Sequence, residues 1–124
     1  MNKILVIDDS APIRLICNRA LSKQGYQVIE AENGAMGCQL AVTDSPDLVL
    51  LDVMMPRMDG FEVLEKLKAD PATSSLPVIM LTSRDEVEDL ASALELGVAG
   101  YIIKPVAPDD LCNSVRQVLS ACLT

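Results

Sequence analysis

The sequence predicts an α/β protein in which a parallel sheet is covered by helices on both faces. Short runs of aliphatic residues alternate along the chain with stretches whose apolar residues recur at helical spacing. The run at residues 48–51 is apolar throughout, as in strands that are buried on both faces of a parallel sheet. The units of one strand and one helix are short, so each strand connects to the next by a direct helical crossover.

Size and composition indicate one domain. The chain has 124 residues and is 50% hydrophobic, and we expect a single domain over residues 1–124. It carries 10 Lys and Arg against 18 Asp and Glu, a formal net charge of -8, which disfavours general binding to nucleic acid or to an anionic membrane. The chain has few aromatic side chains that could stack on nucleic-acid bases, with one Phe, two Tyr and no Trp.

No apolar run approaches the length of a membrane span, so we expect no membrane insertion. The start of the chain lacks the features of a secretion signal, and we expect a cytoplasmic protein. The four cysteines are widely spaced and form no CxxC pair, which favours buried reduced thiols over a disulfide or a zinc site. They are Cys17, Cys38, Cys112 and Cys122.

Five strands are predicted, at residues 4–7, 27–31, 48–51, 78–81 and 101–103. The first helix follows the first strand. Pro12 suits its first turn and Gly25 its end. The second helix opens at Asn33 and stops before Ser45.

The later helices also have start signals. Asp59 and Glu62 have capping-box spacing at the start of the third helix, Ser83 and Glu86 repeat this spacing before the fourth, and the fifth starts near Pro108. The apolar residues at helical spacing are Ile13, Ile16, Cys17, Ala20 and Leu21, then Met36, Leu40 and Ala41, then Phe61, Leu64 and Leu67, then Val87, Leu90, Ala91 and Leu94, and finally Leu111, Val115, Val118, Leu119 and Cys122.

Five strands alternating with five helices favour a doubly wound sheet with right-handed crossovers. We expect the flavodoxin-like strand order 2-1-3-4-5, which places the first and third strands side by side. Asp8 and Asp9 follow the first strand and Asp52 follows the third. These three carboxylates would therefore converge at the edge where ligands bind in such sheets.

Three neighbouring carboxylates repel one another unless one is protonated or a cation lies among them. Their hard oxygen ligands suit Mg²⁺, whereas zinc lacks its usual ligands because the chain has no His. The alternative for Asp8 or Asp9 is that one of them only caps the first helix. The pairing with Asp52 favours a metal site.

Two more strand ends contribute polar groups. Thr82 ends the fourth strand with a hydroxyl that can donate to an oxyanion, and Lys104 follows the fifth with an ammonium that can pair with a phosphate. Each is weak evidence alone, since such residues are usually structural or solvated. A carboxylate can attack phosphorus and form an acyl phosphate, and Asp52 is the nucleophile that this arrangement favours.

Taken together, these residues resemble the receiver domain of bacterial response regulators, the CheY-like switch proteins of two-component signalling. The resemblance covers essentially the whole chain. The motif positions that match in order and spacing are Asp8-Asp9, Asp52 with Met55-Pro56 and Asp59-Gly60, Thr82, and Lys104-Pro105.

The resemblance implies that Asp52 accepts a phosphoryl group from a phosphohistidine of a sensor histidine kinase or a histidine phosphotransfer protein. It implies Mg²⁺ held by Asp9, Asp52 and the backbone carbonyl of Met54, with Asp8 acting mainly through water. Thr82 and Lys104 would contact the phosphoryl oxygens.

Further roles are implied by the same resemblance. Tyr101 matches a switch aromatic that turns inward when Thr82 is drawn to the phosphate, although it could be a plain edge-strand aromatic. The Lys104-Pro105 bond is expected to be cis. Met54 and Arg84 lie at positions that influence the access of hydrolytic water, and the lifetime of the acyl phosphate stays open.

We expect a signalling switch and not an enzyme. Its phosphorylated form would change protein binding through the face formed by the fourth helix, the fifth strand and the fifth helix. An alternative is a receiver domain cut from a larger regulator with an output domain. An aspartyl-phosphate phosphatase is less favoured, because Met54 stands where such enzymes place a second acid, and a non-phosphorylated adaptor is less favoured because the acidic set is complete.

Overall fold

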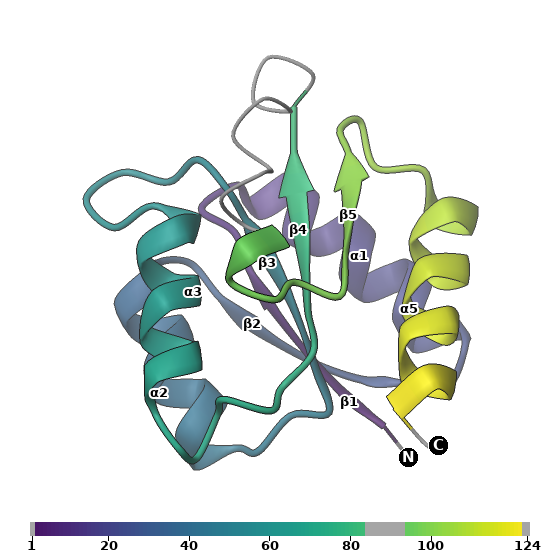
Figure 1. Cartoon of the computed structure of the whole chain (residues 1–124). Helices are drawn as coiled ribbons and strands as arrows, with labels where there is room; N and C mark the ends of the chain where they lie inside the picture. Colours follow the sequence, from purple (N-terminus) through teal and green to yellow (C-terminus); the bar gives the residue numbers. More distant parts are fainter. Residues whose placement is uncertain (1, 84–93, 123–124) are drawn as a thin grey trace.

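The computed structural model describes residues 2–83 and 94–122, and its centre is a five-stranded parallel sheet (Figure 1). The strands are β1 (Lys3–Ile7), β2 (Gln27–Ala31), β3 (Leu48–Asp52), β4 (Val78–Thr82) and β5 (Gly100–Ile103). Their hydrogen-bonded order is β2-β1-β3-β4-β5, and all neighbours are parallel. The predicted fold class and strand order are confirmed.

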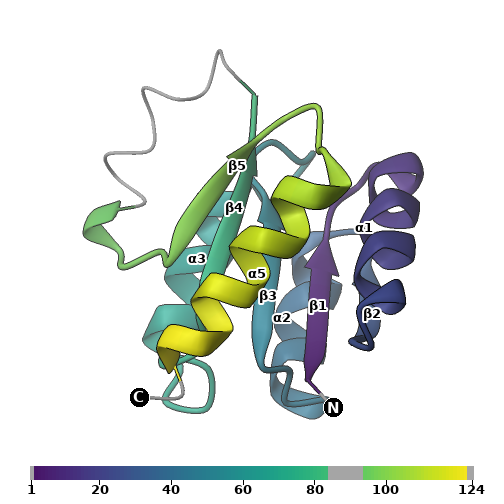
Figure 2. The same cartoon turned by 90° about the vertical axis from the view of Figure 1, so that its right-hand side faces the viewer.

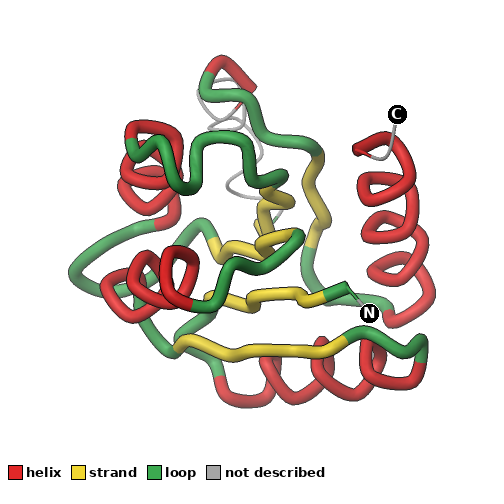
Figure 3. The backbone as a smooth tube through the Cα atoms, turned by 90° about the horizontal axis from the view of Figure 1, so that it is seen from below, coloured by secondary structure: helices red, strands yellow, loops and turns green. Residues whose placement is uncertain are grey.

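Helices cover both faces of the sheet. They are α1 (Ala11–Lys23), α2 (Gly34–Thr43), α3 (Gly60–Ala69) and α5 (Pro108–Cys122). α1 and α5 lie on one face, and α2 and α3 lie on the other (Figures 2 and 3). The predicted fourth helix, with its Ser83 and Glu86 cap, falls largely on residues 84–93, which lie outside the described residues. No helix in residues 2–83 and 94–122 has the length and apolar character needed to cross a membrane.

The starts of three helices are determined by short polar side chains. Ser10 caps α1, where its hydroxyl accepts from the backbone of Ile13 at 3.4 Å. Asn33 caps α2 and Asp59 caps α3, each accepting from the backbone N–H three residues on. Such caps satisfy backbone donors that have no partner inside the helix. The predicted cap at Asp59 is confirmed.

The core consists of two apolar layers, one on each face of the sheet. Successive residues of a strand point to opposite faces. Ile4 and Val6 therefore pack with α1 and α5, while Leu5 and Ile7 pack with α2 and α3. β3 is buried along its whole length in the same way, and this explains its unbroken apolar run.

Most predicted apolar helix positions in the described part of the chain face these layers, but Ile16, Met36 and Leu94 are exposed. A helix buries only a limited stripe, so apolar residues at its margin remain in contact with solvent. Cys17 and Cys112 are buried free thiols and Cys38 is half-buried. This matches the predicted reduced thiols for the three cysteines whose side chains are described.

Gly60 lets the start of α3 pack directly on the end of β3. A Cβ atom at Gly60 would overlap the carbonyl oxygen of Asp52 and lie 2.8 Å from the Cα of Val53. The Gly60 N–H donates to the Val53 carbonyl at 2.8 Å. Because these neighbours are backbone atoms, they cannot move aside as a side chain could.

We therefore predict that Gly60→Ala lowers the free energy of unfolding by about 2 kcal/mol, since an added methyl group forces the backbone apart. Gly100→Ala is the matched control, because a Cβ there meets nothing within 4 Å. The control should change stability by less than about 0.5 kcal/mol. Urea unfolding of both variants checks the prediction, and equal midpoints would contradict it.

Candidate functional site

The polar residues predicted from the strand ends meet at the carboxyl edge of the sheet, the upper edge in Figure 1. Asp52 is the last residue of β3 and Thr82 the last of β4. Asp8 directly follows β1, and Lys104 directly follows β5. Parallel pairing brings the four chain segments to the same edge.

Asp52 lies at the centre of this group. It is only 3% exposed, and its Oδ1 accepts a hydrogen bond from Lys104 Nζ at 2.9 Å. Lys104 Nζ also lies 3.4 Å from Oδ2 of the fully buried Asp8. One oxygen from each of Asp8, Asp9 and Asp52 lies within 4.8 Å of the others, and Asp9 faces solvent. The site is thus an acidic cluster in which the Lys104 ammonium pairs with Asp52 and Asp8.

The β5 end is tied to its neighbour by the backbone as well. The Lys104 N–H donates to the carbonyl of Thr82 at 2.6 Å, which continues the pairing of β4 and β5 by one residue. The Lys104-Pro105 peptide bond is cis, as expected.

Besides its ion pair with Lys104, Asp8 is held by three hydrogen bonds of its backbone and side chain. Its N–H donates to the Ala31 carbonyl at 3.1 Å, its Oδ1 accepts from the Ser10 N–H at 2.8 Å, and its carbonyl accepts from the Arg14 guanidinium at 2.6 Å. The cap of α1 is Ser10, so the alternative in which Asp8 or Asp9 only caps this helix is wrong.

Arg14 was missed by the sequence reasoning. A cation early in a helix is electrostatically unfavourable, because the amino end of a helix carries partial positive charge. Arg14 is the fourth residue of α1, whose first turn has no acidic residue. This unfavourable placement is the signal that could have singled it out.

The buried carboxylate of Asp52 binds its proton tightly. Burial is the main cause, and the negative charge of Asp8 adds to it. Together they outweigh the hydrogen bond from Lys104 and raise the pKa of Asp52 to about 7. For Lys104, burial alone would lower the pKa, but the carboxylates of Asp52 and Asp8 outweigh it and raise the pKa above its usual value. Lys104 is therefore charged at neutral pH.

This donor set fits Mg²⁺. Three carboxylates supply hard oxygen ligands that lie within 4.8 Å of one another, and in the described part of the chain Lys104 is the cation paired with them. Oδ2 of Asp8 is buried, and apart from its ion pair with Lys104 at 3.4 Å it accepts no hydrogen bond among the described residues. A buried oxygen without a hydrogen bond is costly, and a cation or its bound water would satisfy it.

The other predicted residues are arranged around this cluster. The Thr82 side chain is buried, and its hydroxyl donates to the Ser83 carbonyl at 3.2 Å. The side chains of Tyr101 and Met54 are turned to solvent, at 48% and 63% exposure. Arg84 lies outside the described residues.

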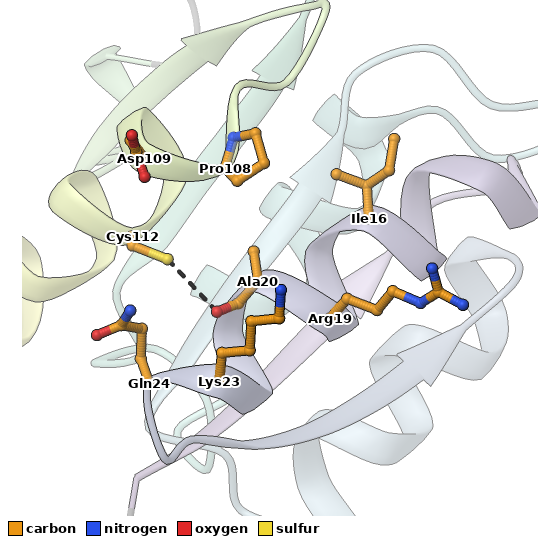
Figure 4. A pocket seen from close by; sticks show the side chains of 8 residues that line it. All are labelled: Ile16, Arg19, Ala20, Lys23, Gln24, Pro108, Asp109 and Cys112. Carbon is orange, nitrogen blue, oxygen red and sulfur yellow. Dashed lines mark hydrogen bonds between the residues drawn. The ribbon is translucent and has the colours of Figure 1, made fainter.

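A separate groove of about 310 Å³ lies between α1 and α5 (Figure 4). It contains none of the predicted site residues. On its wall the Cys112 thiol points to the Ala20 carbonyl at 3.6 Å. The lining residues are Ile16, Arg19, Ala20, Lys23, Gln24, Pro108, Asp109 and Cys112.

Comparisons of the sequence with known proteins agree with this arrangement. The chain is 44% identical over 117 residues to the probable transcriptional regulator ycf27 of Porphyridium aerugineum, and 41% identical over 116 residues to the phosphate regulon transcriptional regulatory protein PhoB of Pseudomonas aeruginosa. Each match covers 94% of this chain but only 48% and 51% of those proteins, so the chain spans about half their length. Protein PilH of Pseudomonas aeruginosa is 38% identical over 97% of this chain and 99% of its own.

Solved structures give the same result. The chemotaxis protein CheY4 of Vibrio cholerae superposes with a TM-score of 0.90 at 30% identity, over 95% of this chain and 98% of its own. A response regulator of Chloroflexus aurantiacus, described as putative, superposes with a TM-score of 0.90 at 28% identity. The family model of the response regulator receiver domain matches residues 4–116. The chain therefore belongs to the receiver domains of response regulators in two-component signalling.

Proposed function

We propose that this receiver domain is a phosphorylation-dependent switch in which Asp52 is the phosphoacceptor. The observation that carries the proposal is the burial of the Asp52 carboxylate between an acidic cluster and the ammonium of Lys104. Such a site can hold a cation and a phosphoryl group together. The phosphodonor is a phosphohistidine of a sensor histidine kinase or of a histidine phosphotransfer protein.

In the proposed transfer, one oxygen of Asp52 attacks phosphorus in line with the leaving group. The bond between phosphorus and the imidazole nitrogen breaks, and its electron pair stays on the imidazole. Lys104 moves from the free carboxylate to a phosphoryl oxygen, and the Thr82 hydroxyl rotates from the Ser83 carbonyl to donate to another.

The metal ligands in this proposal are Asp9, Asp52 and the backbone carbonyl of Met54, with Asp8 acting mainly through water. Mg²⁺ held by these groups would supply positive charge to the phosphoryl oxygens during transfer. The grouping of the three carboxylates, and the buried Asp8 Oδ2 that accepts no hydrogen bond among the described residues, support a cation at this cluster.

The output of the switch is a change in protein binding. β5 is an edge strand of the sheet, and it presents Tyr101 and Ile103 to solvent beside α5. The surface that we propose for the downstream partner consists of β5, α5 and the predicted fourth helix. That predicted helix falls largely on residues 84–93, which lie outside the described residues. Tyr101 is the proposed switch residue, and Met54 and Arg84 are proposed to tune the lifetime of the acyl phosphate.

Receiver domains are signalling switches and are generally not classed as enzymes. We propose only self-phosphorylation and dephosphorylation at Asp52, in a cytoplasmic protein that forms one domain over residues 1–124. The relatives named as transcriptional regulators are about twice as long, so an output domain in the same polypeptide remains the alternative arrangement.

Labelling by a small phosphodonor tests the phosphoacceptor. Incubation with Mg²⁺ and acetyl phosphate should add one phosphoryl group, visible in the intact mass, and Asp52→Asn should abolish this addition because the amide is not nucleophilic. Asp59→Asn is the matched control, since it removes a carboxylate nearby in sequence while Asn caps a helix as well as Asp. Labelling of Asp52→Asn at the wild-type level would contradict the assignment of Asp52 as the phosphoacceptor.

The raised pKa of Asp52 predicts pH-dependent Mg²⁺ binding. With a pKa of about 7, the carboxyl is mostly protonated at pH 6 and mostly ionised at pH 8, and a proton competes with the cation. We expect Mg²⁺ to bind about tenfold more tightly at pH 8 than at pH 6. Calorimetric titration with magnesium chloride at both pH values measures this ratio. Equal affinities would mean that the carboxyl is already ionised at pH 6.

A further inference from the structure

We propose that Arg14 is a positioning residue for the metal site, acting through the backbone of Asp8. The inference rests on the proposed function, because it concerns the same acidic cluster. Arg14 is neither one of the proposed Mg²⁺ ligands nor one of the residues proposed to contact the phosphoryl group. Its guanidinium donates to the carbonyl of Asp8, the residue that joins β1 to the acidic loop.

The guanidinium is itself held from the opposite side. Its Nε donates to Glu30 Oε1 on β2 at 3.2 Å, while Asn18 Nδ2 donates to Glu30 Oε2 at 2.9 Å. Ser22 in turn donates to Asn18 Oδ1 at 2.9 Å. These contacts join the Asp8 carbonyl, α1 and β2 in one network.

The geometry requires an arginine. The guanidinium is planar and presents several donors in a fixed fork, so it can hold the Asp8 carbonyl and the Glu30 carboxylate at once. A lysine has one compact charge and cannot hold both in the same fixed geometry. The Arg14 side chain is only 15% exposed, and a charge this buried needs a partner, which Glu30 supplies.

The part of the site that depends on Arg14 is the loop of Asp8, Asp9 and Ser10. Asp9 faces solvent, so the position of its carboxylate depends on the backbone on either side. On one side Asp8 is held by Arg14, and on the other the Ser10 N–H donates to the Asp8 carboxylate. Without Arg14, the Asp8 carbonyl loses the hydrogen bond that it accepts from the guanidinium at 2.6 Å. The loop is then free to rotate, which would move the Asp9 carboxylate away from the cluster.

The competing explanation is that Arg14 only stabilises the fold. The two explanations differ in how a variant responds to Mg²⁺. If Arg14 positions the site, its loss lowers the affinity for Mg²⁺, and a higher Mg²⁺ concentration restores binding. If Arg14 only stabilises the fold, its loss leaves the Mg²⁺ affinity of the folded protein unchanged.

The test compares Arg14→Met and Arg14→Lys with Arg19→Met. Arg19 lies on the same helix, is exposed, and has no ion pair or side-chain hydrogen bond in residues 2–83 and 94–122, so it is a matched control. Calorimetric titration of the folded proteins with magnesium chloride alone should show about tenfold weaker binding for Arg14→Met. This is the size of effect typical when a residue that supports a metal ligand is removed. Arg14→Lys should lie between Arg14→Met and the wild type, and Arg19→Met should match the wild type.

Phosphorylation by acetyl phosphate supplies a second readout. For Arg14→Met the Mg²⁺ concentration at half-maximal rate should rise about tenfold, while the rate at saturating Mg²⁺ stays within about twofold of the wild type. Should Arg14→Met fail to fold, Arg14→Lys and Glu30→Gln take its place, since each keeps part of the network.

The outcomes separate the two proposals. Wild-type Mg²⁺ affinity in the Arg14 variants, together with normal labelling of the wild type at Asp52, overturns the positioning role alone. A wild-type protein that is not labelled at Asp52 overturns the proposed function, whatever the Arg14 variants bind.

Discussion

The structure depends on one electrostatic constraint, the burial of the Asp52 carboxylate at the end of the central strand. An ionised carboxylate in an apolar core is costly unless it is paired. Lys104 supplies that pairing, with its Nζ 2.9 Å from Oδ1 of Asp52. The same ammonium also forms an ion pair with Oδ2 of Asp8 at 3.4 Å. Among residues 2–83 and 94–122, Lys104 is the cation that pairs with both buried acids. Burial of the carboxyl is the main cause of the raised pKa of Asp52, and the neighbouring charge of Asp8 adds to it. The grouping of Asp8, Asp9 and Asp52 gives the fit to a divalent cation.

Much of the fold could be predicted because local patterns agree with the final arrangement. The apolar run of β3 indicated burial on both faces, and the alternation of strands with helices indicated a parallel sheet. The site residues Asp52, Thr82 and Lys104 could be predicted for the same reason, since each stands at a strand end and parallel strands end together. Their proposed roles still depend on the experiments described above.

Arg14 could not be predicted in the same way. Its two partners are the carbonyl of Asp8, which directly follows β1, and Glu30 on β2, and only the folded sheet brings them to the same guanidinium. The cap of α1 was also missed, because the sequence reasoning considered Asp8 or Asp9 and not Ser10, whose hydroxyl accepts from the Ile13 N–H. Backbone geometry selects Ser10 and leaves Asp8 to the acidic cluster.

The pairing of β4 with β5 has a consequence for how far a signal must travel. Thr82 pairs with Ile103, and its carbonyl accepts from the Lys104 N–H at 2.6 Å. Neighbouring strands lie about 4.8 Å apart. A displacement of Thr82 at the site would thus reach the outer edge of the sheet across a single row of backbone hydrogen bonds. In the proposed switch, the phosphorylation site and the edge strand β5 would therefore be separated by one strand spacing, and a single row of backbone hydrogen bonds would connect them.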